Sequence, residues 1–171
     1  MAARGDVDLT QAAGHLLARY AWAIDDRAYD ELRDVFTPDV VADYGPFVCR
    51  GADEMVARMR DLHEGLRTTQ HLVGSVLARL EPDGTATVRS HVRAVLVRGT
   101  GEWGRVEVAA SYRDVMVSHG SGHRIAQRRV EGRWIAGERS ILPWFHDRLS
   151  DEDARSAPAG AQSTSHDDRG V

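Results

Sequence analysis

The sequence of 171 residues is poor in cysteine, in clustered basic residues and in long apolar runs, and each of these features is required by a particular class of protein. Its single cysteine, Cys49, excludes an internal disulfide and a cysteine metal cluster. Lysine is absent and the arginines are spread along the chain, so no basic block indicates nucleic-acid binding. No apolar run approaches the roughly 20 residues of a membrane-spanning helix. The first residues also lack the apolar segment of a secretory signal, so we expect a cytoplasmic protein without a membrane or nucleic-acid partner.

A long amphipathic helix is the first pattern that the chain does contain. Apolar side chains recur at spacings of three and four residues from Leu9 to Ile24. This spacing predicts a helix that ends at Asp25. We expect residues 1–8 to form a flexible arm before it.

Two shorter helices and a pair of short strands are predicted next. Residues 28–36 have an apolar face and predict a short helix. This helix ends before Pro38, because the residue before proline avoids the helical conformation. Two extended pieces follow on either side of Gly45-Pro46, and a further helix opens at Gly51.

The rest of the chain is rich in strand patterns separated by glycine-containing turns. We place the long strands near residues 69–80, 85–98, 105–118 and 122–130. The stretches GHRIAQRR and GRWIAGER resemble each other, and we favour the first as the final strand. The segment 131–149 is then a lid or a subunit contact, and the polar residues 150–171 are a disordered tail.

Helices followed by long antiparallel strands predict an α+β fold. We expect one domain over residues 9–149, in which a strongly curved antiparallel sheet wraps around the N-terminal helices. Such a cone has an apolar interior and one open end, which suits a pocket for a small-molecule substrate.

Three stretches carry a resemblance to a known family. In chain order they are YAWAIDDRAYDELRDVFTPDVVADYGPF, RTTQHLVGSV and ASYRDVMVSHGSGHRIAQRRV. Over residues 9–130 the chain resembles the SnoaL-like branch of the NTF2-like superfamily, and in particular scytalone dehydratase and bile-acid 7α-dehydratase-type proteins. The resemblance implies an NTF2-like cone and a homo-oligomer, either a dimer or a trimer.

The resemblance also implies a set of catalytic residues. Asp25, Tyr44 and His71 match, by local context, an aspartate at the end of the first helix, a tyrosine after the second helix and a strand histidine of scytalone dehydratase. Val97 stands where the second pocket histidine of that family is expected. His91 lies six residues earlier on the same strand and therefore on the same face.

Four residues are candidate substrate-binding groups. Tyr20 resembles a pocket tyrosine of the bile-acid dehydratase branch, with plain core packing as the alternative. Tyr112 falls at a polar pocket position of scytalone dehydratase. His91 lines either the pocket or an interface, and Arg128 binds an anionic or enolate oxygen or forms a surface ion pair.

The chemistry of Asp25 and His71 follows from their side chains. One imidazole can remove a proton from carbon and then protonate a leaving hydroxyl, provided that a carboxylate fixes its tautomer. Tyr44 can donate a hydrogen bond to a substrate carbonyl. The alternatives are a structural core histidine, an aspartate that caps a helix and a half-buried tyrosine.

Neither a metal site nor a cofactor is predicted. His119 and His123 flank a glycine turn without an evident further ligand. The chain has neither a dinucleotide-binding fingerprint nor a phosphate-binding loop.

The sequence thus predicts a cofactor-free acid–base enzyme of secondary metabolism. The favoured activity is a lyase, a dehydratase of a small cyclic or polyketide-like molecule. A SnoaL-like polyketide cyclase or a ketosteroid-isomerase-like isomerase is the runner-up. A non-catalytic module that binds small molecules is the third hypothesis, because a fold does not determine a function.

Overall fold

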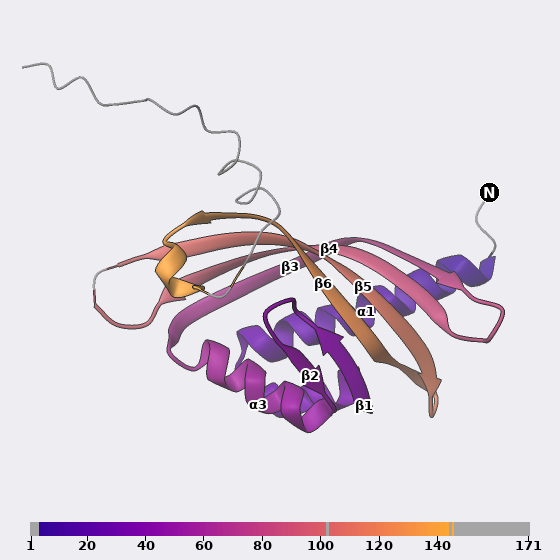
Figure 1. Ribbon diagram of the computed structural model, residues 1–171. Helices are drawn as coiled ribbons and strands as arrows, with labels where there is room; N and C mark the ends of the chain where they lie inside the picture. The colour runs from indigo at the N-terminus through magenta and orange to yellow at the C-terminus, as the bar shows by residue number, and fades with distance from the viewer. Residues whose placement is uncertain (1–3, 102, 144, 146–171) are drawn as a thin grey trace, which may run out of the picture.

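The computed structural model describes residues 4–101, 103–143 and 145. Within them the predicted α+β architecture is confirmed: helices pack against one face of a six-stranded sheet (Figure 1). The elements in chain order are α1 (Arg4–Asp25), η1 (Tyr29–Glu31), α2 (Leu32–Val35), β1 (Phe36–Asp43), β2 (Val48–Arg50), α3 (Ala52–His63), β3 (Leu66–Leu80), β4 (Ala86–Arg98), β5 (Arg105–His119), β6 (Gly122–Gly137) and η2 (Arg139–Ile141).

The order of strands in the sheet is β2-β1-β6-β5-β4-β3. All neighbouring strands are antiparallel except β1 and β6, which run parallel. The four long strands are joined as successive hairpins, and the sheet curves over the helices (Figure 1). This curvature gives the sheet an inner face, which is the face that α1 contacts, and an outer face.

The inner face carries the main core of the protein. In β4 every second side chain from Ala86 to Leu96 is buried, and the alternate ones from Thr87 to Arg93 are exposed. The core joins the inner side of the sheet, β1 included, to α1 and α3, and Ile24, Phe36 and Met55 are among its fully buried members. Burial of the apolar stripe of α1 is therefore what holds the helix against the sheet.

A second, smaller core lies further along the inner face. Its buried members are Ala94, Leu96, Val106, Val108, Ile135 and Leu142. The segment expected to be a lid or a subunit contact is therefore divided. Residues 131–137 belong to β6, Leu142 packs into the second core, and residues 146–149 lie outside the described part of the chain.

The N-terminal part differs from the prediction in two places. Helix α1 begins at Arg4, so most of the predicted flexible arm is helical. The single helix expected over residues 28–36 is instead a 3₁₀ turn, η1, followed by one turn of α-helix, α2. Phe36 already has an extended backbone, so the chain enters β1 before Pro38.

The final strand is longer than predicted. The sequence offered two stretches, GHRIAQRR and GRWIAGER, as alternatives for the final strand. All of the first stretch and the second as far as Gly137 belong to the 16-residue strand β6. Its pairing with β5 shifts register between Ala109 and Ala110 and between Val115 and Met116. Such irregularities let a long strand bend while most of its backbone hydrogen bonds are kept.

No helix in the described part of the chain is long and apolar enough to span a membrane. The predicted disordered tail, residues 150–171, lies outside the described residues.

Candidate active site

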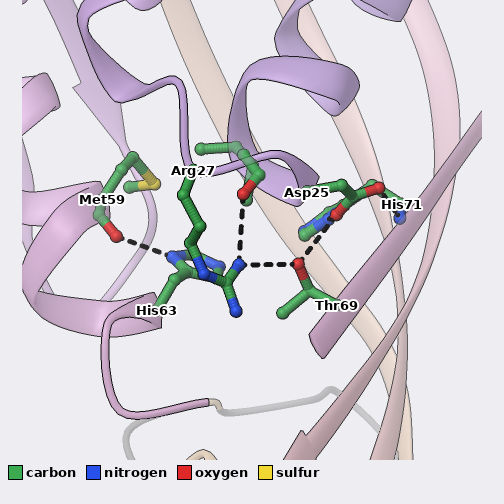
Figure 2. A network of polar contacts seen from close by, with 7 residues as sticks. Asp25, Arg27, Met59, His63, Thr69 and His71 are labelled. Atoms are coloured by element: carbon green, nitrogen blue, oxygen red, sulfur yellow. Dashed lines mark hydrogen bonds and ion pairs between the residues drawn. The ribbon is translucent and has the colours of Figure 1, made fainter. Parts of the chain in front are cut away.

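Asp25 and His71, which are 46 residues apart in sequence, form a hydrogen-bonded pair on the inner face (Figure 2). Asp25 is the last residue of α1, and His71 lies on β3. The Nδ1 atom of His71 lies 2.7 Å from the Oδ1 atom of Asp25, and the backbone amide of His71 donates to Oδ2 at 2.8 Å. The carboxylate thus accepts two hydrogen bonds from one residue, which fixes both the backbone and the ring of His71.

Thr69 is a further partner of this carboxylate. It lies two residues before His71, so the two side chains point to the same face of β3. The Thr69 hydroxyl donates to Oδ1 of Asp25 at 2.8 Å and accepts a hydrogen bond from Nη1 of Arg27 at 3.2 Å. Arg27 therefore supports the carboxylate through the threonine (Figure 2).

These contacts determine the charge of Asp25. Burial by itself would raise the pKa of this carboxyl, since burial disfavours the charged form. The hydrogen bonds from the ring and amide of His71 and from Thr69 outweigh burial and hold the pKa of Asp25 below its usual value. Asp25 is therefore a carboxylate at neutral pH, and the His71 nitrogen that faces it carries the hydrogen, which leaves the lone pair on Nε2.

Sequence reasoning missed a second histidine beside this pair. His63, the last residue of α3, is 7% exposed, and its ring centroid lies 5.9 Å from that of His71. Val97, which stands where the resemblance implies a second pocket histidine, lies on β4 as expected, so His63 comes from a different element. The sequence shows only that His63 lies eight residues before His71. It does not show that α3, which ends at His63, brings this side chain beside β3.

Tyr44 and Tyr20 form a separate polar contact. Their hydroxyl oxygens lie 3.2 Å apart, and the Tyr44 hydroxyl also donates to the sulfur of Met55 at 3.8 Å. Burial, together with the neighbouring Tyr20, raises the pKa of Tyr44 well above its ordinary value, so it is a neutral hydrogen-bond donor. Among the described residues no hydrogen bond joins these tyrosines to Asp25 or His71.

Arg128 is deeply buried and is not part of a surface ion pair. Its Nε and Nη2 atoms donate to the two carboxylate oxygens of Asp114 at 2.9 and 2.8 Å. The guanidinium carbon lies 4.4 Å from the ring centroid of Tyr20 and 4.2 Å from that of Tyr112. The ring of Phe36 makes a third cation–π contact with the same guanidinium. Its Nη1 atom is buried without a hydrogen-bond partner in the described part of the chain.

His91 does not join this group of residues. It lies on the outer face of β4, where its side chain is exposed, because its neighbours Ser90 and Val92 point to the core. A hollow of about 490 Å³ on this face is lined by His91, Arg93 and Trp134, among other residues. The structure therefore places His91 on the face opposite Asp25 and His71.

A larger hollow, of about 1270 Å³, is lined mainly by outward-facing side chains of β1, β3, β4, β5 and β6. Asp25, His63 and His71 line neither hollow. The side chains of the pair are not sealed from solvent, however: His71 keeps 8% of its side-chain surface and Asp25 keeps 15%. In the described part of the chain no group of histidine, cysteine and carboxylate side chains is arranged to hold a metal ion.

The fold and this geometry define a class: α+β proteins with a curved sheet over a long helix and a histidine–carboxylate pair on the inner face. The family model of the SnoaL-like domain matches residues 6–129, so the protein belongs to the SnoaL-like family of the NTF2-like superfamily, as the sequence resemblance predicted. A search of curated proteins gives no match.

Solved structures with the same fold include two proteins of Novosphingobium aromaticivorans. One, a candidate scytalone dehydratase, is 21% identical with a TM-score of 0.70, over 83% of this chain and 91% of that one. The other, a candidate aromatic ring hydroxylase, is 19% identical with a TM-score of 0.70, over 82% and 99%. The protein Aln2 of a Streptomyces species is 18% identical with a TM-score of 0.63, over 73% and 91%. At these identities the likeness is one of fold, which is thus shared by proteins named for different reactions.

Proposed function

We propose that this protein is a cofactor-free acid–base enzyme in which His71 is the general base and then the general acid, oriented by Asp25. The observation that carries the proposal is the 2.7 Å contact between Nδ1 of His71 and Oδ1 of Asp25. A structural histidine needs one hydrogen-bond partner. Here the carboxylate binds both the ring and the backbone of His71, and Thr69 and Arg27 hold the carboxylate in turn.

The proposed reaction is a dehydration beside a carbonyl group. Nε2 of His71 takes a proton from the carbon next to the carbonyl, and Asp25 stabilises the imidazolium that results. The electron pair of the broken C–H bond passes through the enolate and forms a carbon–carbon double bond as the neighbouring C–O bond breaks. The imidazolium returns its proton to the departing hydroxide, which leaves as water, so that His71 is neutral again.

The proposed substrate is a small cyclic or polyketide-like secondary metabolite. Aromatic side chains near the centre of the fold suit a ring, since Phe36 and Tyr112 each lie about 6 Å edge-on from Tyr20. The neutral hydroxyl of Tyr44 is the proposed donor to the substrate carbonyl, and the Nη1 atom of Arg128 is a second candidate donor.

Dehydration is preferred to the runner-up reactions, a polyketide cyclisation or a ketosteroid-type isomerisation. All three begin with the same proton abstraction, so the Asp25–His71 pair alone does not separate them. The preference rests on the resemblance of the sequence to scytalone dehydratase and on the candidate scytalone dehydratase among the proteins of similar fold.

The test is a set of variants incubated with a panel of small hydroxylated cyclic ketones, with products followed by mass spectrometry for the loss of one water. We expect His71→Ala to lower turnover by about 10²–10⁴-fold, and Asp25→Asn by a smaller factor. Thr69→Val should reduce turnover by about 10-fold because Asp25 loses one donor. Thr68→Val, at the exposed neighbouring position, and His119→Ala, at the exposed end of β5, are the matched controls and should leave turnover unchanged.

Unchanged conversion in both His71→Ala and Asp25→Asn would show that the proposed site is wrong. Products of unchanged mass would favour isomerisation over dehydration. Ligand-induced stabilisation without any product from the panel would favour a binding module.

A further inference from the structure

The feature that the proposed reaction leaves unused is the second imidazole, His63. It comes from α3, whereas His71 comes from β3, and the two ring planes are inclined at 56° with their centroids 5.9 Å apart. At this distance and inclination the two rings form a tilted aromatic contact, so both imidazoles line one place on the inner face.

The hydrogen on the His63 ring has a defined place. Its Nδ1 atom lies 2.8 Å from the carbonyl oxygen of Met59, one helical turn earlier (Figure 2). A carbonyl oxygen only accepts hydrogen bonds, so Nδ1 is the donor and the lone pair lies on Nε2. In the described part of the chain the ring hydrogen bonds of both histidines are made by Nδ1, to Met59 for His63 and to Asp25 for His71, and neither Nε2 atom takes part in one.

His63 is also uncharged at neutral pH. Burial lowers its pKa to about 4, against the opposing effect of the Met59 carbonyl. The charge of Arg27, and that of His71 when it is protonated, act in the same direction as burial, and only Asp25 opposes them among the nearby charges. His63 therefore has no proton to give at Nε2 and can act there only as a hydrogen-bond acceptor.

We propose that His63 is a specificity-determining residue, whose Nε2 atom accepts a hydrogen bond from a hydroxyl group of a neutral substrate held against His71. Two neighbouring imidazoles that each have an acceptor nitrogen suit a ligand that brings a hydrogen-bond donor, and a free hydroxyl is the simplest such group. The inference rests on the proposed function for the role of His71, whereas the recognition by His63 requires only binding. It predicts a ligand with a free hydroxyl rather than its methyl ether or a carboxylate salt.

The structural alternative is a core histidine that needs only its bond to Met59. That histidine would stabilise the end of α3 and would not distinguish one ligand from another. Ligand discrimination is therefore the readout that separates the two roles.

The test uses two probes that differ in one hydrogen-bond donor, phenol and anisole, with affinities measured by NMR titration of the full chain. We expect phenol to bind at least about 10-fold more tightly than anisole, the effect of one hydrogen bond. His63→Leu should abolish this preference. His63→Gln, whose side-chain oxygen can take the place of Nε2, should retain part of it. Phenol, but not anisole, should also shift the ¹⁵N resonance of Nε2 of His63 in the unmodified protein, a measurement that needs no variant.

Equal affinities for phenol and anisole, or no phenol binding up to its solubility limit, would overturn the proposal. A preference that survives His63→Leu, or that disappears only in His71→Leu, would assign the acceptor to another residue and would overturn it as well. Because no step of this test requires turnover, its result is independent of whether the protein proves to be a dehydratase.

Discussion

Asp25 accepts three hydrogen bonds, from the ring and amide of His71 and from Thr69. Each donor orients the carboxylate, and together they prevent it from turning toward water. These hydrogen bonds stabilise the charged form of Asp25 and lower its pKa, although burial by itself would raise that pKa. At the scale of single residues, the site is therefore an oriented imidazole with its lone pair directed away from the carboxylate.

The same residues predict how stability depends on pH. The pKa of His63 falls from 6.5 to about 4 on folding, so between these values the unfolded chain binds more protons, and stability decreases as the pH is lowered. The loss across this range is about 3 kcal/mol. The pKa of Asp25 is lowered as well, so its contribution is present above the unfolded value of 3.8 and is lost at still lower pH.

Urea unfolding at pH 7.5, 5.5 and 4.5 measures this effect. We expect His63→Gln to be less stable than the unmodified protein at pH 7.5 but to lose much less stability on acidification. Parallel pH curves for the two proteins would show that His63 is not a buried neutral histidine.

At the scale of elements, the site forms because the end of α1 lies beside the start of β3, where β3 begins to pair with β4. Arg27 joins the two elements: it donates to the carbonyl of Ile24 at 3.2 Å, to the hydroxyl of Thr69 at 3.2 Å and to the carbonyl of Leu66 at 3.1 Å. Its backbone has a φ of 63°, in the left-handed region that side chains other than glycine rarely adopt. The bonds of the guanidinium therefore hold the backbone in a strained conformation.

Replacement of Arg27 separates these two contributions. Arg27→Ala should lower the free energy of unfolding by about 2 kcal/mol, because three hydrogen bonds are lost. Arg27→Gly loses the same bonds but adopts the left-handed conformation without strain, so it should be more stable than Arg27→Ala by about 0.5–1 kcal/mol. Chemical denaturation of the two variants measures the difference, and equal stabilities would contradict the assignment of strain to this position.

At the scale of the whole molecule, the curved sheet divides the protein into a covered inner face and an uncovered outer one. Leu72 and Leu77 lie on β3 opposite the outward-facing Arg93 and Arg89, and they are 61% and 58% exposed. Exposed apolar side chains on one face are typical of an interface. We propose that this face is covered in a homo-oligomer, a dimer or a trimer, as the resemblance implied.

Light scattering coupled to gel filtration tests this proposal. The unmodified chain should elute at two or three times the mass of one subunit, and Leu72→Asp combined with Leu77→Asp should shift it to the monomer. Trp22→Gln, at an exposed position of α1, is the control and should leave the mass unchanged. If the unmodified protein elutes at the mass of one subunit, the proposed homo-oligomer is wrong.

Much of the fold could be predicted from local patterns. The three- and four-residue spacing in α1 and the alternation in β4 follow from the geometry of each element and its burial on one side. The same alternation put His91 and Arg93 on one face but did not say which face is covered. Likewise the similarity of two stretches concealed that β6 runs through the first and most of the second, because local sequence does not reveal how far a partner strand extends.

The sequence by itself determined which groups are available: an aspartate that ends a helix, a histidine and a threonine on one face of a strand, and a family with a known fold. Only the tertiary structure decided that Asp25 meets His71, that His63 lies beside them and that Arg128 is buried against Asp114. The physical reason is that each of these contacts joins different elements. Such contacts form only when the apolar faces of helix and sheet pack together, and the register of that packing is a property of the whole chain.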